Sequence, residues 1–260
     1  MRAIIVPNYE KRGTADILES VKTILTNNAI DFSVNQDVTG FDGDVIITIG
    51  GDGTIIHAAK KGAEKRIPIL GINAGRIGYL ADISSGELEL LSALKDESYE
   101  IEERMMLEVS LGEEKFYCLN EAVISKGSLS RMIDIELSVD NSEIFYRADG
   151  LIAATPTGST AYSMSAGGPV VDPSLDLIIL TPICSNSLFD RPILLNKDSL
   201  INVSTICPEN TEAYLTVDGE QSVKIYPNQQ LSIKRAAHTA KLIKIKNSSF
   251  YETLSEKMRG

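Results

Sequence analysis

The chain has 260 residues, a formal net charge of −11 and a hydrophobic content of 43%. This length suits one or two domains, and this apolar content is sufficient for buried cores. The acidic balance argues against binding nucleic acid through a general basic surface, although a nucleotide needs only a local site. No apolar run reaches membrane-spanning length, and MRAIIVPNYE is too short and interrupted for a signal peptide, so a cytoplasmic location is the default expectation.

The cysteines and histidines do not indicate a disulfide framework or a zinc site. Cys118, Cys184 and Cys207 are an odd number without C-x-x-C spacing. We expect them to be reduced and mostly buried. His57 and His238 lie far apart in the sequence, which argues against zinc binding.

The first hundred residues alternate between strand and helix patterns. Short apolar runs predict strands at 3–6, 31–35, 44–49 and 67–75. Helical patterns cover 15–27, 54 to about 61, and 84–95; in the first of these Ile17, Val21 and Leu25 share one stripe. Strands that alternate with helices predict a mainly parallel sheet with helices on its faces.

From about residue 101 the period changes to two. The stretch 132–140 places Ile133, Ile135, Leu137 and Val139 on one face of a strand, and Asp134, Glu136 and Ser138 on the other. Residues 106–124 read as two strands around Gly112, a hairpin turns at Asp218–Gly219, and 231–246 continues the strand pattern. The tail is helical, with Ser249 as its cap. We therefore expect an α/β domain over 1–100, a β-rich domain over 101–247 and a helical segment at 248–260.

The stretch GGDGT, residues 50–54, joins a predicted strand to a predicted helix. It is not a Walker A loop, and Ile56 breaks the G-x-G-x-x-G fingerprint. Glycines still let the backbone approach a phosphate, and a helix N-terminus offers free N–H donors. The carboxylate of Asp52 then has three readings: a turn or helix cap, a Mg²⁺ ligand, or a general base.

A second cluster is rich in hydroxyl groups. Within 155–162, four serine or threonine residues and Tyr162 surround Pro156 and Gly158. A turn entering a helix, capped by Thr157 or Ser159, explains one or two of these hydroxyls. The others predict a polar pocket for a ligand rich in hydroxyls or carrying an amide. Tyr162 is either an aromatic wall of that pocket or a core residue.

The third group is acidic. Asn120 and Glu121 interrupt the apolar stretch YCLNEAVI, and Asp149 with Gly150 precedes an apolar strand. Carboxylates are usual partners of ribose hydroxyls in dinucleotide folds. The plainer alternatives are solvent-facing strand residues for Asn120–Glu121 and a turn for Asp149–Gly150.

Taken in order, GGDGT, GINAGRIGYL, LNEAVI and DGLIAATPTGSTAYSMSAGGPVV resemble the NAD kinase family. GGDGT alone is shared with lipid kinases and, more loosely, phosphofructokinases. The stretch TPTGSTAYS after an Asn-Glu strand is specific to NAD kinases. The resemblance is strong over 44–173 and weaker over nearly all the rest, including LTVDGE.

The resemblance implies phosphorylation of NAD at the 2′-hydroxyl of its adenosine ribose, with ATP and Mg²⁺ or another divalent metal, giving NADP and ADP. It also implies a Rossmann-like N-terminal domain, to which the C-terminal segment 248–260 returns, and a C-terminal β-sandwich that binds NAD. Members form homodimers or homotetramers, with the NAD site completed near a subunit boundary. No nucleic acid or membrane partner is implied.

The resemblance also implies roles for individual residues. The catalytic residue is Asp52, and no side chain is assigned to a metal. The NAD-binding positions are Asp52, Gly53, Asn120, Glu121, Asp149, Thr160, Ala161, Tyr162 and Ser165. The phosphate or ATP positions are Gly50, Gly51, Gly53 and Thr54.

Two positions depart from the common family pattern. Asn186 stands where many members have histidine, and His57 stands where many have arginine. Lys60 or Lys61 is a possible substitute for that arginine in contacting phosphate.

Two other functions compete with this one. The first is another GGDGT kinase, acting on a lipid or a sugar. The serine- and threonine-rich cluster argues against a lipid substrate. The second is a non-catalytic NAD sensor, which would be expected to lack Asp52. An assay of NADP formation with ATP and Mg²⁺ separates all three.

Overall fold

The structure is a computed structural model that describes residues 1–75, 78–128, 131–140, 142–187, 190–208, 211–226, 229–246 and 249–259. It divides the chain into a first unit, Met1–Arg104 with His238–Gly260, and a second unit, Met105–Ala237. The first boundary lies close to the expected one at residue 100. The second lies ten residues before the expected one, because the strand that follows His238 belongs to the first unit. The assignment of these units as functional domains stays a prediction.

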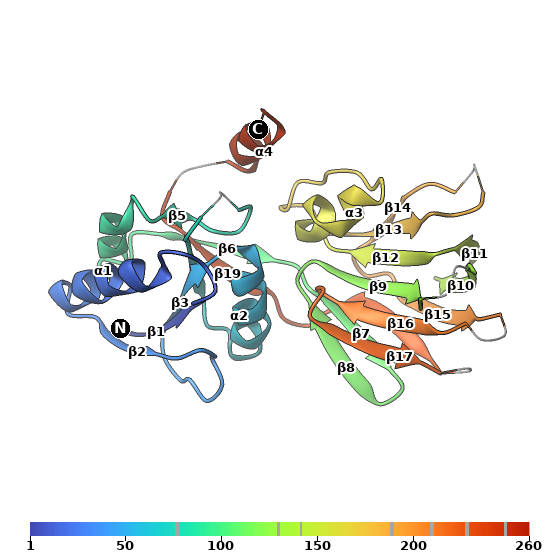
Figure 1. Cartoon of the computed structure of the whole chain (residues 1–260), viewed down its shortest axis with the longest axis horizontal. Helices are drawn as coiled ribbons and strands as arrows, with labels where there is room; N and C mark the ends of the chain where they lie inside the picture. The colour runs from blue at the N-terminus through green and yellow to red at the C-terminus, as the bar shows by residue number, and fades with distance from the viewer. Residues whose placement is uncertain are drawn as a thin grey trace. The chain divides into compact units, whose positions relative to one another are not determined.

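The first unit is built on a mainly parallel sheet with the strand order β2-β1-β3-β4-β19-β6, and β5 beside β4 (Figure 1). Only the β19–β6 pairing is antiparallel among its described pairings. The strands are β1 Arg2–Pro7, β2 Asp31–Val34, β3 Val45–Gly50, β4 Ile69–Asn73, β5 Ile83–Ser84, β6 Glu100–Arg104 and β19 Ala240–Lys244. This confirms the predicted α/β fold.

Helices in the first unit are α1 Thr14–Asn27, α2 Asp52–Lys65, the 3₁₀ helix η1 Leu88–Leu94, and α4 Phe250–Arg259. The predicted stripe on α1 is confirmed, since Ile17, Val21 and Leu25 are buried. The prediction of an ordinary helix over 84–95 is wrong in type. The buried leucines of η1 recur every third residue, at 88, 91 and 94, which matches the three-residue turn of a 3₁₀ helix.

The second unit consists of two antiparallel sheets packed on a common apolar core (Figure 1). One has the order β11-β10-β15-β18-β7-β8: Ser142–Ala148, Ile133–Val139, Ile201–Ile206, Leu231–Arg235, Leu107–Leu111 and Glu114–Cys118. The other has the order β14-β13-β12-β9-β16-β17: Ile193–Asn196, Leu177–Ile183, Gly150–Ala154, Glu121–Lys126, Ala213–Val217 and Gln221–Ile225. The expected β-sandwich is confirmed, as is the alternation along β10, whose four apolar residues are buried.

The stretch 106–124 contains three strands rather than the predicted two. Strands β7 and β8 form a hairpin around Gly112, and the chain then leaves their sheet at Leu119–Asn120. It enters the opposite sheet as β9, which begins at Glu121. Asn120 and Glu121 therefore lie where the chain changes sheets, not inside one continuous strand.

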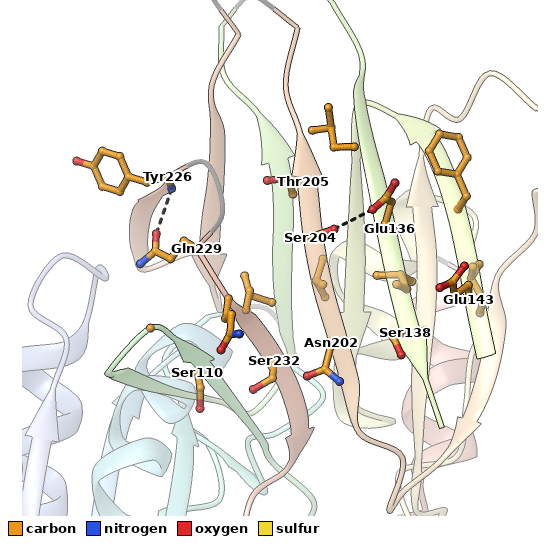
Figure 2. Close-up of a pocket in the computed structure, with 18 residues that line it drawn as sticks. Ser110, Glu136, Ser138, Glu143, Asn202, Ser204, Thr205, Tyr226, Gln229 and Ser232 are labelled. Atoms are coloured by element: carbon orange, nitrogen blue, oxygen red, sulfur yellow. Dashed lines mark hydrogen bonds between the residues drawn. The ribbon is translucent and has the colours of Figure 1, made fainter. Parts of the chain in front are cut away.

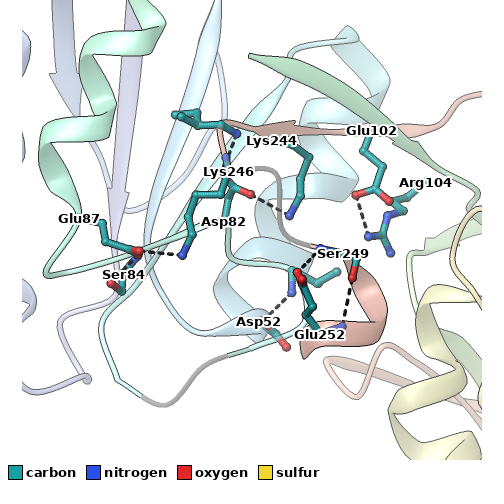
Figure 3. A network of polar contacts seen from close by, with 12 residues as sticks. Asp52, Asp82, Ser84, Glu87, Glu102, Arg104, Lys244, Lys246, Ser249 and Glu252 are labelled. Carbon is teal, nitrogen blue, oxygen red and sulfur yellow. Dashed lines mark hydrogen bonds and ion pairs between the residues drawn. The ribbon is translucent and has the colours of Figure 1, made fainter. Parts of the chain in front are cut away.

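Within the first unit, a buried ion pair at Asp82 anchors the end of β19 and the segment that follows it (Figure 3). The side chain of Asp82 is only 1% exposed and lies 2.8 Å from the ammonium of Lys244. Its Oδ2 accepts the backbone N–H groups of Ile245 and Lys246, at 2.7 and 3.1 Å. The segment is thus fixed by both its backbone and its side chains.

A second ion pair lies beside the first one. The ammonium of Lys246 is 2.7 Å from the carboxylate of Glu87, which also accepts the backbone N–H and hydroxyl of Ser84. The bond from Lys246, followed by those from Ser84, lowers the pKa of Glu87 to about 2. Glu87 is therefore ionised throughout the neutral range.

Helix α4 begins with the predicted cap. The hydroxyl of Ser249 accepts the backbone N–H of Glu252, and the Glu252 carboxylate accepts that of Ser249. None of the described α4 residues is fully buried. The helix contacts the rest of the unit through Tyr79, whose ring lies 6.3 Å from that of Phe250 and 3.8 Å from the ammonium of Lys257.

Within the described ranges, no helix is both long enough and apolar enough to cross a membrane. The three cysteines are free. Cys118 is buried, Cys207 is half-buried and Cys184 is exposed, so the expectation that they are mostly buried is wrong for Cys184.

We predict that Asp82→Ala lowers the free energy of unfolding by about 3–5 kcal/mol, because it leaves Lys244 without its buried partner and frees two backbone N–H groups. Urea denaturation followed by circular dichroism measures this. The matched control is Glu19→Ala. Glu19 forms an ion pair with Lys22, but its side chain is 73% exposed. That change should cost about 0–1 kcal/mol. Equal losses in the two variants would contradict the anchoring role of Asp82.

Candidate active site

The GGDGT stretch joins β3 directly to α2. Helix α2 begins at Asp52, two residues earlier than predicted, and its N-cap residue is Gly51 with no side-chain capping bond. Gly51 O accepts the backbone N–H groups of Thr54 and Ile55, at 3.0 and 3.3 Å. The N–H groups of Asp52 and Gly53, the first two residues of the helix, have no partner within it. The cap reading of Asp52 is therefore wrong, and the loop presents N–H donors at a helix N-terminus.

The carboxylate of Asp52 is held by the loop after β4 (Figure 3). Its Oδ2 accepts the backbone N–H of Tyr79 at 2.8 Å, and its Oδ1 accepts that of Leu80 at 3.2 Å. A side chain at Gly78 would overlap this carboxylate, so glycine is required there. Each oxygen keeps a lone pair for a further partner, because each accepts one of these bonds.

The glycines of the loop serve two different purposes. A Cβ on Gly50 would overlap the side chain of Thr54, whose hydroxyl accepts the Asn8 amide at 3.2 Å. A Cβ on Gly51 or Gly53 would meet nothing within 4 Å. Packing within the protein therefore explains Gly50 but not Gly51 or Gly53. The open space beside these two suits a ligand that approaches the backbone.

The basic residues of α2 are partly committed elsewhere. The ammonium of Lys61 forms an ion pair with Asp37, and this bond is the main cause that lowers the pKa of Asp37 to about 2. His57 Nε2 lies 4.0 Å from the same carboxylate. Lys61 is thus engaged with Asp37, and the suggestion that it contacts phosphate has no support.

In the second unit, Glu121 is a buried carboxyl group. Its residue is 6% exposed, and its Oε2 has no hydrogen-bond partner. Burial, and then the charge of Asp218, raise its pKa to about 7, against a hydrogen bond from the backbone N–H of Tyr162. The solvent-facing alternative is therefore wrong for Glu121. A buried oxygen without a partner is costly unless a ligand completes its hydrogen bonding.

The hydroxyl-rich stretch forms the short helices η2 Thr157–Thr160 and α3 Tyr162–Ser165. The hydroxyl of Thr155 donates to Leu119 O at 2.6 Å, and that of Ser159 donates to Val171 O at 3.2 Å. These two hydroxyls stabilise the loop instead of lining a pocket.

The predicted ligand positions in this stretch are more accessible. Thr160 and Ala161 are half-buried, Ser165 is exposed and Tyr162 is 45% exposed, so Tyr162 is not a core residue. Through the bond from the Tyr162 N–H, the structure brings this group together with Glu121.

Asp149 lies apart from this group. Its carboxylate is 2.8 Å from the ammonium of Lys126. The register pairs Gly150 with Ser125 and Ala154 with Glu121, so Asp149 is at the far end of β12. At about 3.3 Å per residue, it is roughly 16 Å from Glu121 along the strand. The structure does not bring these two carboxylates together within one chain.

One functional candidate was missed by the sequence analysis. Asp218 lies in the turn between β16 and β17 and accepts backbone N–H groups of Leu119, Asn120 and Glu121. In the sequence, Asp218–Gly219 indicated only a hairpin turn, and nothing local related it to residues almost a hundred positions away.

A separate hollow of about 1150 Å³ lies on the outer face of the sheet that contains β10, β15 and β18 (Figure 2). Its lining contains both polar and apolar side chains, and Ser204 on β15 donates a hydrogen bond of 3.2 Å to Glu136 on the adjacent strand β10. None of the predicted site residues lines it. The candidate site is therefore distinct from this hollow.

Family comparisons cover both units. The ATP-NAD kinase N-terminal domain matches residues 11–99, and the ATP-NAD kinase C-terminal domain matches residues 119–245. The chain is 35% identical to an NAD kinase of Natranaerobius thermophilus, over 100% of this chain and 99% of that protein. It is 43% identical to an NAD kinase of Carboxydothermus hydrogenoformans, over 83% of this chain and 79% of the relative.

Solved structures agree with these matches. An NAD kinase from Archaeoglobus fulgidus in complex with ATP superposes with a TM-score of 0.84 at 30% identity, over 100% of this chain and 99% of that one. A yeast NADH kinase complexed with NADH superposes with a TM-score of 0.89 at 22% identity, over 100% of this chain and 87% of that one. This match shows that the fold is shared. The resemblance recognised in the sequence is confirmed: the chain belongs to the ATP-NAD kinase family.

Proposed function

We propose that this chain transfers the γ-phosphoryl group of ATP to the 2′-hydroxyl of the adenosine ribose of NAD, giving NADP and ADP. The observation that carries this proposal is the arrangement around Asp52. A single carboxylate, oriented by two backbone N–H groups, stands at a helix N-terminus between two glycines with open space beside them. Family membership favours this reaction over a lipid or sugar kinase and over a sensor.

On the phosphate side, Gly50, Gly51, Gly53 and Thr54 form the loop that approaches ATP. Free N–H groups and the partial positive charge of the α2 N-terminus attract phosphate. Gly51 and Gly53 leave the backbone uncovered, while Gly50 permits the close packing of Thr54. The loop thus supplies positive potential in a protein whose net charge is −11.

On the acceptor side, Asn120 and Glu121 bind the ribose hydroxyls of NAD. The free Oε2 of Glu121 is a hydrogen-bonding group awaiting a ligand. Thr160, Ala161, Tyr162 and Ser165 complete this side, with the half-exposed Tyr162 ring as a stacking surface. Asp149 and Gly53 contact other parts of the dinucleotide.

The residues present fit a divalent metal that arrives with ATP. Among the described residues, no cluster of three or more His, Cys, Asp or Glu side chains suits a metal ion. Mg²⁺ characteristically keeps several waters and binds through one or two carboxylates plus substrate phosphates. We therefore assign Mg²⁺ chiefly to the phosphates, with Asp52 as a carboxylate of the same loop. When bound, the metal neutralises phosphate charge.

Asp52 acts as the general base. The N–H groups of Tyr79 and Leu80 fix the direction of its carboxylate, which accepts the proton of the ribose 2′-hydroxyl. The 2′-oxygen then bonds to the γ-phosphorus as the bond from that phosphorus to the β-phosphate oxygen breaks, releasing ADP. Phosphoryl transfer depends mainly on positioning and charge stabilisation, which this loop provides.

We predict that Asp52→Asn loses at least about a hundredfold in kcat, because an amide cannot accept the proton. The amide oxygen still accepts one of the two N–H bonds, so NAD binding should stay within a few-fold of wild type. Calorimetric NAD binding and NADP formation at saturating ATP and Mg²⁺ measure the two effects. The control is Asp16→Asn, which changes an exposed carboxylate in the first turn of α1 and should leave kcat unchanged. Near-normal kcat in Asp52→Asn would make Asp52 only an anchor for the 78–80 loop.

We predict a pH-dependent stability caused by Glu121. Its pKa is raised from 4.5 to about 7, so the folded state binds this proton more tightly than the unfolded state. The free energy of unfolding contributed by this group therefore falls as pH rises from about 4.5 to about 7, by on the order of 3 kcal/mol. The Glu121→Gln variant has no titrating group at this position. The difference in free energy of unfolding, variant minus wild type, should therefore rise by that amount between pH 4 and pH 8.

Chemical denaturation at a series of pH values measures this difference. A Glu121→Ala variant should raise the KM for NAD far more than the KM for ATP, because it removes the ribose partner altogether. A constant stability difference across the pH range, or equal changes in both KM values, would contradict the role of Glu121.

We also propose that the active protein is a homodimer or homotetramer. The support is the family and the separation of Asp149 from Glu121, which suits a site completed by a second copy. We predict that light scattering at micromolar concentration detects an oligomer, and that activity falls on dilution below its dissociation constant. A fully active monomer would refute this. The cytoplasmic location stays a prediction.

A further inference from the structure

The Asp218 carboxylate binds three consecutive backbone N–H groups of the segment that carries Asn120 and Glu121. Its Oδ2 accepts the N–H of Leu119 at 3.0 Å, and its Oδ1 accepts those of Asn120 and Glu121, at 2.8 and 3.1 Å. Hydrogen bonds to an ionised acceptor are stronger than neutral ones. The carboxylate thus replaces the strand partner that these N–H groups lack where the chain changes sheets.

The same segment is bonded on its carbonyl side. Leu119 O accepts the Thr155 hydroxyl at 2.6 Å, and Asn120 O accepts the Thr155 backbone N–H at 2.8 Å. Glu121 O accepts the backbone N–H of Asp218 at 3.0 Å. Leu119–Glu121 is therefore held between the β16–β17 turn and the loop after β12, and its position depends on both.

The turn itself favours aspartate. Asp218 has φ 49° and Gly219 has φ 68°, both in the left-handed region. Asn and Asp tolerate this region better than other non-glycine residues. The turn therefore places one short acidic side chain against the segment without displacing the strands beside it.

The charge of Asp218 also acts on Glu121. Burial raises the pKa of the Glu121 carboxyl, and two neighbouring groups change it further. The Asp218 carboxylate in the β16–β17 turn raises it, and the hydrogen bond from the Tyr162 backbone N–H in α3 lowers it. A protonated carboxyl donates a hydrogen bond, whereas a carboxylate only accepts. Near neutral pH the nucleotide thus meets a group that is available in both forms.

We propose that Asp218 is a positioning residue of the NAD site, which fixes the backbone of Asn120 and Glu121 and favours the proton-donating form of Glu121 toward a ribose oxygen. This rests on the proposed function of that site. In this role Asp218 acts through the backbone of its neighbours rather than through a contact with NAD.

The test compares Asp218→Asn, which removes the charge and keeps one acceptor oxygen, with Asp218→Glu, which keeps the charge on a longer side chain. Glu220→Gln is the matched control, since it removes an exposed charge from the same turn. For each protein, NADP formation is measured from pH 5.5 to pH 9 with NAD and ATP varied separately. The same series is repeated in a Glu121→Gln background.

We expect Asp218→Asn to raise the KM for NAD at least about tenfold, from the loss of bonds to a charged acceptor, and to leave the KM for ATP within about twofold. Its pH profile for kcat/KM with NAD should move to lower pH, and this movement should vanish in the Glu121→Gln background. Asp218→Glu should raise the KM for NAD without moving the profile. Glu220→Gln should match wild type.

A KM for NAD within twofold of wild type in both Asp218 variants would overturn the proposal. So would equal increases in both KM values with an unmoved profile, which would indicate a purely structural residue. If Asp218→Asn does not fold, Asp218→Glu decides by its NAD-specific change in KM. Wild-type protein that forms no NADP would instead refute the proposed function itself.

Discussion

Carboxylates that accept backbone N–H groups from distant parts of the chain hold the functional segments of this protein in place. Asp52 binds the loop at 79–80, Asp82 binds the segment at 245–246, and Asp218 binds the segment at 119–121. In each case the N–H groups lie where helices and sheets do not provide a partner. Buried backbone donors must be satisfied, so the position of each segment depends on one acidic side chain.

Glu121 shows the opposite arrangement. It is buried beside another carboxylate and retains an oxygen without a partner, which lowers the stability of the folded protein at neutral pH. Local conflicts of this kind are expected where a protein binds a ligand. The surrounding bonds to Asp218 and Thr155 offset this cost by fixing the backbone on both sides. The site is therefore rigid in its backbone and incomplete in its hydrogen bonding.

The sequence predicted the features that depend on local pattern. The stripe on α1, the alternation on β10, the turn at Asp218–Gly219 and the cap at Ser249 follow from neighbouring residues, and the structure confirms them. It did not predict that β19 joins the first sheet or that the chain changes sheets before Glu121. Those features rest on bonds between residues 97 to 164 positions apart. Apolar periodicity does not encode such pairings, so the sequence alone presents Asn120 and Glu121 as polar residues within one apolar strand.

The glycine loop shows the same limit at smaller scale. The sequence reveals Gly50, Gly51, Gly53 and Gly78 but not that the first and last are fixed by packing while the other two face open space. That difference shows how a carboxylate can stand in a loop that is proposed to bind phosphate. The carboxylate of Asp52 is turned toward the N–H groups of the loop after Gly78, and the backbone at Gly51 and Gly53 remains uncovered. The proposed role of Asp52 in activating a hydroxyl is thus compatible with phosphate binding at Gly51 and Gly53, because its carboxylate does not occupy their N–H donors.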